Sequence, residues 1–453
     1  MRILQRIGFG LAASVAALAA LLAVWNLTSG SPAIAPSQES TATFDAQALL
    51  VAVDGDMAGT AYADGKLHPV ADAADLLIGV DLKSLEQETF RVEASNSVMG
   101  WPGSAALSSD GRFAYVIETR GQIDRQVEAL DNVYLEMPNG SAVTTVELAR
   151  NKVVDTRNAC RRPSSVDVAP NGAWLLVACA DATAELAVVA LTDGIPSAVR
   201  NIDLNLPDFT ARPGVDEGLT YGMIHPDGAA AGVIQTNAGV ALVTFELDDA
   251  GIPRSAQTES PTYDGKWLSV ARWTASGEYL LVADVAWGPK PTDAVFNGNG
   301  AVHAFALAPQ NDKRGVVSSA EVSRSPEAIE LNAAGDLLIA VNMERTYLPG
   351  GPLAVIPGRD ASSLSLIAVD SATGNLETVS APVGFKGILP EDAVFDRDGD
   401  MLAVVVYQDH DAPRSHGWLE FFAVDRSADA PTLTPTGRQL PLPRGAHDLV
   451  IQH

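Results

Sequence analysis

The sequence has few cysteines and histidines and carries none of the common short catalytic motifs. Two cysteines and seven histidines occur in 453 residues. No G-x-S-x-G elbow, H-E-x-x-H pair or G-x-x-x-x-G-K-[ST] loop is present. These absences argue against a serine hydrolase of the elbow type, a zincin and a phosphate-loop nucleotide enzyme. We therefore expect any site to be built from residues that only the folded chain brings together.

Basic residues are also scarce. The chain has 30 Lys and Arg against 56 Asp and Glu, a net charge of −26. Such a surface repels phosphate backbones, and no basic stripe with interleaved aromatic residues occurs, so a nucleic-acid partner is excluded. The charge fits either a soluble acidic surface or attraction of a cationic partner or ligand.

The two cysteines lie close to one predicted hairpin. Cys160 precedes the expected inner strand PSSVDV, and Cys179 ends the returning strand AWLLVA. Antiparallel pairing would bring them together, which predicts a Cys160–Cys179 disulfide that staples one blade in an oxidising compartment. They form neither a C-x-x-C redox motif nor a haem-attachment motif.

One long uncharged run occurs, from Ile7 to Trp25, preceded by Arg2 and Arg6. It predicts a signal peptide, with a small-residue cleavage zone around Ala33 to Ala35, or an uncleaved membrane anchor. Residues 1–30 are assigned to this segment and residues 31–44 to a linker. Both alternatives place the rest of the chain in the periplasm or otherwise outside the cytoplasm, with membrane contact only through the anchor.

A repeat fills the remaining chain. Six copies of an apolar stretch, a tight glycine turn and an aliphatic run occur, spaced 49 to 64 residues apart, with turn glycines Gly111, Gly172, Gly228, Gly277, Gly335 and Gly399. A seventh copy is split between the C-terminal LPRGAHDLVIQH and AQALLVAVDG near the start. The pattern predicts an all-β fold, a seven-bladed β-propeller over residues 45–453, closed by pairing of terminal strands.

The repeat resembles the YVTN and lactonase-like propellers of bacterial export. The resemblance rests on a pattern of P-x-x-apolar, followed by a turn with S-x-D-G or N-G and then by an aliphatic strand. It rests also on SLSLIAVDSATGNLETV, which is similar to the outer-strand signature of these propellers. It covers roughly residues 45–453. It implies a periplasmic or surface propeller whose relatives include lactone hydrolases, binding modules and proteins of unknown role.

One face of the expected propeller carries long loops. The segments entering the inner strands and the loops joining second to third strands share that face, and five of these loops are long: 55–74, 119–132, 284–300, 342–362 and 407–417. Long loops on a rigid scaffold commonly carry binding. The residues predicted to ring the mouth are Glu391, Asp392, Arg444 and His447 as catalytic candidates, and Glu327, Tyr221, Arg162 and Trp101 as ligand-binding candidates.

These residues leave two interpretations open. The carboxylates, Arg444 and His447 could bind a divalent metal or open a lactone by general acid–base chemistry. They could equally be ion pairs between blades, with His447 packed and hydrogen-bonded. No cofactor other than this metal is indicated.

Weaker candidates lie elsewhere. Asp396, Asp398 and Asp400 suggest a calcium loop or a β-turn, and turn chemistry favours the turn. His410 and His416 share a loop that lacks fixed metal-ligand spacing. The aromatic residues of the long loops, Tyr347, Trp287 and Phe296, form a ligand floor or anchor their loops.

Three functions remain. The first is a binding or scaffold module that holds an unidentified protein or small molecule on the long-loop face. The second is a lactonase-like hydrolase at the mouth. The third is a subunit of a periplasmic redox or envelope complex.

Overall fold

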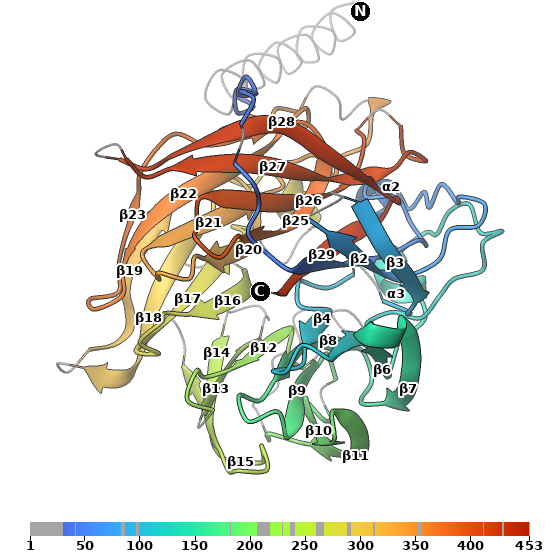
Figure 1. The fold of residues 1–453 in the computed structure, drawn as a ribbon, viewed down its shortest axis with the longest axis vertical. Coiled ribbons are helices and arrows are strands. Elements are labelled where there is room, and N and C mark those ends of the chain that lie inside the picture. The colour runs from blue at the N-terminus through green and yellow to red at the C-terminus, as the bar shows by residue number, and fades with distance from the viewer. Residues whose placement is uncertain are drawn as a thin grey trace, which may run out of the picture.

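The computed structural model describes residues 30–452 apart from short stretches at 41, 83–86, 97–98, 182, 206–217, 229, 236–240, 260–266, 288–290, 311–312, 352–355, 411 and 428–429. Seven antiparallel sheets are arranged radially around an axis (Figure 1). The prediction of an all-β, seven-bladed propeller is confirmed. The predicted signal or anchor lies, except for Gly30, outside the described residues. None of the helices that the structure describes is both long and apolar enough to cross a membrane.

Each blade has four main strands, which lie side by side in order from the axis to the outside of the ring. The blades, in chain order and each listed from its inner strand, are as follows: β4 (Ala105–Leu107), β5 (Phe113–Ile117), β6 (Ala142–Glu147) and β7 (Lys152–Asn158); β8 (Pro163–Val168), β9 (Trp174–Cys179), β10 (Leu186–Thr192) and β11 (Ile195–Ile202); β12 (Tyr221–Ile224), β13 (Ala230–Gln235), β14 (Ala241–Leu247) and β15 (Pro253–Glu259); β16 (Leu268–Trp273), β17 (Tyr279–Asp284), β18 (Ala301–Gln310) and β19 (Lys313–Glu321); β20 (Pro326–Leu331), β21 (Leu337–Asn342), β22 (Ser362–Asp370) and β23 (Asn375–Thr378), with β24 (Val383–Phe385) also on β22; β25 (Ile388–Phe395), β26 (Met401–Gln408), β27 (Gly417–Asp425) and β28 (Thr432–Leu442); and β29 (Ala446–Gln452), β1 (Ala48–Val53), β2 (Leu76–Asp81) and β3 (Gln87–Glu93).

The last blade closes the ring with strands from both ends of the chain. β29 pairs antiparallel with β1, and Leu50 lies opposite Val450. The predicted closure is therefore confirmed. β1 lies inside its sheet and β29 is the inner strand beside the axis, so the two ends of the chain stabilise one blade and close the ring.

The six turn glycines all adopt the left-handed conformation, with φ between 66° and 73°. Each turn joins an inner strand to the second strand of its blade, and in the turn at Gly111 the glycine N–H donates to the carbonyl of Ser108 at 2.8 Å. A side chain is strained at such φ values, which explains why the repeat keeps glycine there.

Five connections between second and third strands are long, as predicted, and three contain a short helix: α2 (Ala61–Asp64), α3 (Val133–Glu136) and α4 (Pro291–Val295). Because the strands of each blade alternate in direction, these loops lie at the opposite end of the blades from the glycine turns.

The segment expected to be a linker lies against the last two blades before closure. Ile34 forms a parallel bridge with Gly384 of β24, and the N–H of Gln38 donates to the carbonyl of Pro435 at 2.8 Å. Phe44 is buried edge-on against Phe421, with ring centroids 6.0 Å apart. This part of the chain therefore packs on the propeller.

Candidate functional site

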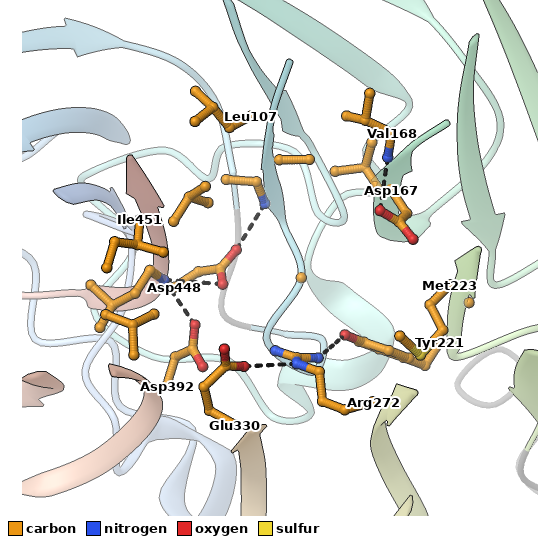
Figure 2. A pocket seen from close by; sticks show the side chains of 18 of the residues that line it. Leu107, Asp167, Val168, Tyr221, Met223, Arg272, Glu330, Asp392, Asp448 and Ile451 are labelled. Carbon is orange, nitrogen blue, oxygen red and sulfur yellow. Dashed lines mark hydrogen bonds and ion pairs between the residues drawn. The ribbon is translucent and has the colours of Figure 1, made fainter. Parts of the chain in front are cut away.

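A cavity of about 460 Å³ lies on the propeller axis between the inner strands (Figure 2). Ser109 and Pro170, which belong to two glycine turns, are among its lining residues, so the cavity reaches the glycine-turn face. Besides Ser109, its polar side chains come from six blades, one from each: Asp167, Tyr221, Arg272, Glu330, Asp392 and Asp448. Aliphatic side chains such as Leu107, Val394 and Ile451 fill much of the remaining wall.

Arg272 links two neighbouring blades across this cavity. Its Nη1 donates to Tyr221 Oη at 2.7 Å, and its Nε donates to Glu330 Oε2 at 2.8 Å. Burial opposes the charge, but Tyr221, Glu330 and Asp392 together hold the pKa of Arg272 well above its ordinary value. Burial also raises the pKa of Tyr221 to about 12. The cavity therefore contains a permanent guanidinium and a neutral phenol.

Asp392 and Asp448 lie on adjacent inner strands. Asp392 Oδ2 accepts from the N–H of Leu449 at 3.0 Å, and Asp448 Oδ2 accepts from Ser104 Oγ at 2.9 Å and from the N–H of Ala105 at 2.8 Å. Burial, followed by the charge of Asp448, raises the pKa of Asp392 well above its usual range. Asp392 is therefore a buried acid that releases its proton at a higher pH than an exposed aspartic acid.

The same carboxylates also join blades. Asp392 binds the backbone of the following blade, Asp448 does so in turn, and Asp167 Oδ2 accepts from the N–H of Ile224 at 2.7 Å. Ser165 Oγ similarly bonds Gly222, accepting from its N–H at 2.9 Å. The polar lining thus stabilises the ring as well as defining the cavity.

One position of the repeat identifies six residues of the cavity lining, three of them charged. The residues five positions before the turn glycines all line the cavity: Ala106, Asp167, Met223, Arg272, Glu330 and Val394. Sequence reasoning considered the residues entering the inner strands and therefore missed Asp167, Arg272 and Glu330. A charged residue at this position, inside an otherwise apolar inner strand, is the pattern that would have found them.

The mouth on the long-loop face is filled by loop side chains. We call this cluster the plug; its buried members are Met57, Ala61, Leu67, Val133, Met137, Met343, Tyr347, Leu348, Ile356, Leu389 and Tyr407. Trp287 packs against it, with its ring centroid 5.6 Å from that of Tyr347 and 6.2 Å from that of Trp101. Tyr347 and Trp287 therefore anchor their loops, whereas Phe296 is 59% exposed.

The structure brings two of the catalytic candidates together near the start of their inner strands. His447 Nδ1 lies 4.0 Å from Glu391 Oε2, and both side chains are almost fully buried. Burial, then Glu327, raises the pKa of Glu391 well above its usual range, and burial raises that of Glu327 to about 8. Burial lowers the pKa of His447 to about 4. None of these residues is among those lining the axial cavity.

Arg444 makes backbone contacts instead. It donates to the carbonyls of His68 at 2.6 Å, Pro413 at 2.8 Å and Gly55 at 3.2 Å, and burial lowers its pKa. Arg162 is buried and donates to the carbonyl of Ala180 at 2.6 Å. Of the eight predicted residues, Asp392 and Tyr221 line the axial cavity. The roles assigned to the others stay predictions.

The remaining candidates have structural contacts. Asp396 Oδ1 accepts from the N–H groups of Asp400 and Met401 at 3.0 and 3.1 Å, so this segment is the β-turn that turn chemistry favoured. The ring of His416 lies 6.3 Å from that of Trp418. Cys160 and Cys179 form the predicted disulfide, which closes a sequence separation of 19 residues.

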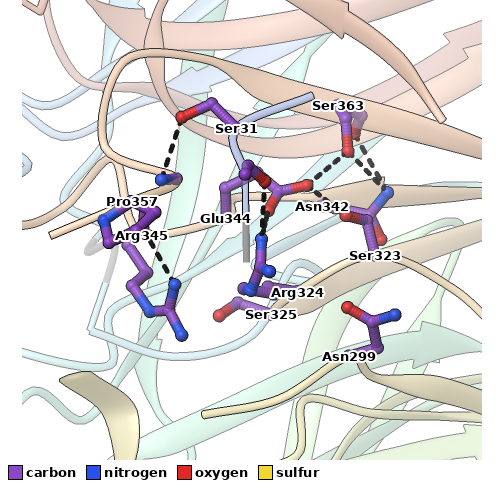
Figure 3. Close-up of polar contacts among 12 residues, drawn as sticks. Ser31, Asn299, Ser323, Arg324, Ser325, Asn342, Glu344, Arg345, Pro357 and Ser363 are labelled. Carbon is purple, nitrogen blue, oxygen red and sulfur yellow. Dashed lines mark hydrogen bonds and ion pairs between the residues drawn. The ribbon is translucent and has the colours of Figure 1, made fainter. Parts of the chain in front are cut away.

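A second polar network ties the N-terminal segment to the β20–β23 blade (Figure 3). Glu344 accepts from Ser363 Oγ at 2.7 Å and from Arg324 Nη1 at 3.3 Å. Arg324 Nη1 also donates to the carbonyl of Gly30 at 3.3 Å, and the N–H of Gly358 donates to Ser31 Oγ at 3.0 Å. The start of the described chain is therefore held by the buried Arg324 side chain and by the backbone N–H of Gly358.

No family model matches the sequence, and no curated protein matches it. Solved structures do match the fold. The periplasmic gluconolactonase of Pseudomonas aeruginosa is 16% identical, with a TM-score of 0.56 over 89% of this chain and 99% of that one. A Bacteroides fragilis protein provisionally assigned as a 6-phosphogluconolactonase is 13% identical, with a TM-score of 0.57 over 90% and 98%.

A hypothetical selenium-binding protein from Sulfolobus tokodaii is 9% identical, with a TM-score of 0.56 over 90% of this chain and 94% of that one. At these identities the likeness concerns the fold. The chain is a seven-bladed β-propeller structurally similar to the lactonase-like propellers.

Proposed function

We propose that this chain is an extracytoplasmic binding propeller that holds a small, polar, positively charged ligand in its axial cavity. The observation that carries this proposal is the cavity of about 460 Å³ with its converging polar side chains. Pockets that combine apolar walls with a few placed polar groups are the usual form of small-molecule sites. The disulfide supports a location in an oxidising compartment.

The balance of charges in the cavity favours a cation. Four carboxyl side chains line it, from Asp167, Glu330, Asp392 and Asp448, and Arg272 is the guanidinium among the lining residues. Arg272 is already engaged by Glu330 and Tyr221, so it offers little to an anion. Carboxylate oxygens accept hydrogen bonds, so a ligand rich in N–H and O–H donors complements this wall.

The plug favours the axial cavity over the long-loop mouth as the place of binding. It fills that mouth with side chains such as Met57, Tyr347 and Tyr407, which are nearly fully buried. A ligand there would have to displace packed apolar groups, whereas the axial cavity requires no such displacement.

Lactone hydrolysis is a second candidate for the same cavity. Asp392 can act as a proton donor because of its raised pKa, and Arg272 could stabilise an oxyanion. Two of the similar structures are named as lactonases, one provisionally. The hydrolase hypothesis therefore shares Asp392 with the sequence prediction but adds Arg272.

A charge series of hexoses tests both candidates. Glucosamine, glucose and gluconate are close in size and differ in charge, so calorimetric titration of the full chain isolates the charge preference. We expect glucosamine to bind more tightly than glucose by about tenfold, and gluconate to bind most weakly. Preference for gluconate would overturn the cation proposal. Turnover of gluconolactone that Arg272→Met abolishes would favour the hydrolase.

A further inference from the structure

Three neighbouring strands of the β16–β19 blade bring an aspartate, a histidine and a serine onto one face of the sheet. His303 of β18 lies opposite Val282 of β17 on one side and opposite Ser319 of β19 on the other. Asp284 lies two residues beyond Val282, and side chains two residues apart in a strand point to the same face. None of the three is among the residues that line the axial cavity.

The imidazole of His303 contacts both of the other groups. Its Nδ1 lies 2.7 Å from Ser319 Oγ, and its Nε2 lies 3.8 Å from Asp284 Oδ2. Hydroxyl, imidazole and carboxylate therefore follow one another as in a Ser–His–Asp triad, with the two ring nitrogens exchanged. Either ring nitrogen can act as the base. Such a triad is recognised by its geometry, so the lack of a G-x-S-x-G elbow does not exclude one here.

The contacts of Asp284 favour the tautomer of His303 that can accept a proton from the serine. Asp284 Oδ1 accepts from the N–H of Trp267 at 3.0 Å and from the N–H of Ala286 at 2.9 Å. These bonds stabilise the carboxylate form, and a carboxylate beside Nε2 favours a proton on that nitrogen. Nδ1 then presents its lone pair to the Ser319 hydroxyl. Contacts between catalytic groups commonly shorten when substrate binds, which brings the 3.8 Å contact with Asp284 within reach of a hydrogen bond.

The base is held in the sheet, whereas the hydroxyl is accessible. Asp284 and His303 are each 6% exposed, and Ser319 is exposed. The buried ring of Phe305 packs edge-on against His303, with ring centroids 6.4 Å apart. Packing of this kind fixes the orientation of the imidazole toward its partners. A reagent in solution can therefore reach Ser319 while His303 stays in place.

We propose that Ser319 is a nucleophile, activated by His303 and positioned through Asp284, that accepts acyl groups from uncharged or cationic aryl esters. Glu321 lies two residues beyond Ser319 on the same face of β19. Its carboxylate and the net charge of −26 disfavour an anionic ester. Aryl esters are suitable because a phenolate leaves more readily than an alkoxide.

The reaction requires only the ester and water. Ser319 Oγ forms a bond to the carbonyl carbon while His303 Nδ1 takes the hydroxyl proton. The tetrahedral intermediate collapses when the bond to the leaving oxygen breaks, and that oxygen takes the proton from His303. Water attacks the acylated serine in the same way and releases the carboxylic acid. Asp284 stabilises the imidazolium that forms in each half of the reaction.

A reactive phosphorus reagent tests whether Ser319 is activated. Diisopropyl fluorophosphate is uncharged, and it forms an Oγ–P bond with release of fluoride. The full chain is treated with it, and the labelled residue is located by peptide mass spectrometry. We expect the label on Ser319, its loss in Ser319→Ala and its retention in the matched control Ser318→Ala. Ser318 is the adjacent serine, and its Oγ accepts from the N–H of Leu376 at 3.0 Å. An unlabelled Ser319, or equal labelling of Ser318, overturns the proposal.

The role of His303 as base is tested by the rate of labelling. We expect His303→Gln to slow labelling of Ser319 by about 100-fold or more, because general-base assistance is lost. An unchanged rate would show that the imidazole does not activate the serine. A measurement on the wild type serves if this variant does not fold. Labelling should be slower in heavy water than in water, since the hydroxyl proton moves as the new bond forms, and equal rates would contradict base catalysis.

Asp284→Asn tests the positioning role. Asparagine keeps an oxygen for the N–H groups of Trp267 and Ala286 but places an N–H beside Nε2, which favours the tautomer with its proton on Nδ1. For hydrolysis of p-nitrophenyl acetate, we expect the maximal rate to fall at least about tenfold while the half-saturating concentration changes little. A variant with an unchanged maximal rate would show that Asp284 does not position the base.

Discussion

Arg272 Nη1 donates to Tyr221 Oη at 2.7 Å, and this bond joins β16 to β12 at the axial cavity. Hydrogen bonds to charged groups contribute about 1.5–3 kcal/mol, against about 1 kcal/mol for neutral pairs. We therefore expect Tyr221→Phe to lower the free energy of unfolding more than Tyr115→Phe, which removes a neutral bond to the carbonyl of Gly194. Equal losses in urea unfolding would show that the Arg272 contact adds nothing.

The disulfide should contribute substantially to stability. Cys160 and Cys179 close a loop with a sequence separation of 19 residues, and closing a loop of this size contributes about 3 kcal/mol in the chain-entropy model. The Cys160→Ala, Cys179→Ala double variant should lose about that much in urea unfolding. Treatment of the wild type with reductant should reproduce the loss. A change below about 1 kcal/mol would mean that the blade does not depend on the bond.

The pH dependence of stability follows from the buried acids. Burial, then the charge of Asp54, raises the pKa of Asp75 to about 8. The folded state then binds more protons than the unfolded state between about pH 4 and pH 8, so the free energy of unfolding falls as pH rises through this window. A difference of one bound proton between the two states changes the free energy of unfolding by at most about 1.4 kcal/mol per pH unit.

Asp75→Asn removes this titration. In chelator-containing buffer, urea unfolding between pH 6.5 and 8 should show a shallower decline in the variant than in the wild type. The slope is compared because the substitution also changes the absolute stability. Parallel slopes would mean that Asp75 is ionised throughout this range in the folded protein.

The N-terminal segment should stabilise the propeller. A chain beginning at Pro36 lacks the contacts of Gly30 and Ser31. It also lacks two backbone bonds with Gly384: the Gly384 N–H donates to the carbonyl of Ala33 at 3.1 Å, and the Ala35 N–H donates to the carbonyl of Gly384 at 2.9 Å. Each bond contributes about 1 kcal/mol. We expect a lower melting temperature than for a chain beginning at Gly30. Identical melting temperatures would show that residues 30–35 do not stabilise the propeller. Cleavage in the predicted zone around Ala33 to Ala35 would then cost no stability.

The repeat was enough to predict the blades, their number and the closure, because glycine turns and strand patterns are local signals. The strand pairing also placed Cys160 beside Cys179. The binding surface was harder to predict. Long loops suggested an open mouth, but the apolar residues within them, such as Met57 and Tyr347, pack together and fill it.

The axial lining depends on which side of an inner strand faces the axis, and that becomes evident only when the copies are aligned on their turns. Arg272 and Glu330 then occupy one position of the repeat. Their meeting across blades, at 2.8 Å, depends on the radius of the ring, which no single repeat encodes.

The most direct test of the axial-cavity proposal is to block the cavity without altering its charges. Ala106 lines it, and Ala106→Phe should fill part of its volume, whereas Ala250→Phe places the same side chain at an exposed turn outside the cavity. Calorimetric titration with glucosamine should show at least about tenfold weaker binding to Ala106→Phe and unchanged binding to Ala250→Phe. Equal affinity of both variants and the wild type, or no binding to the wild type, would contradict the proposal that this cavity binds a cationic polar ligand.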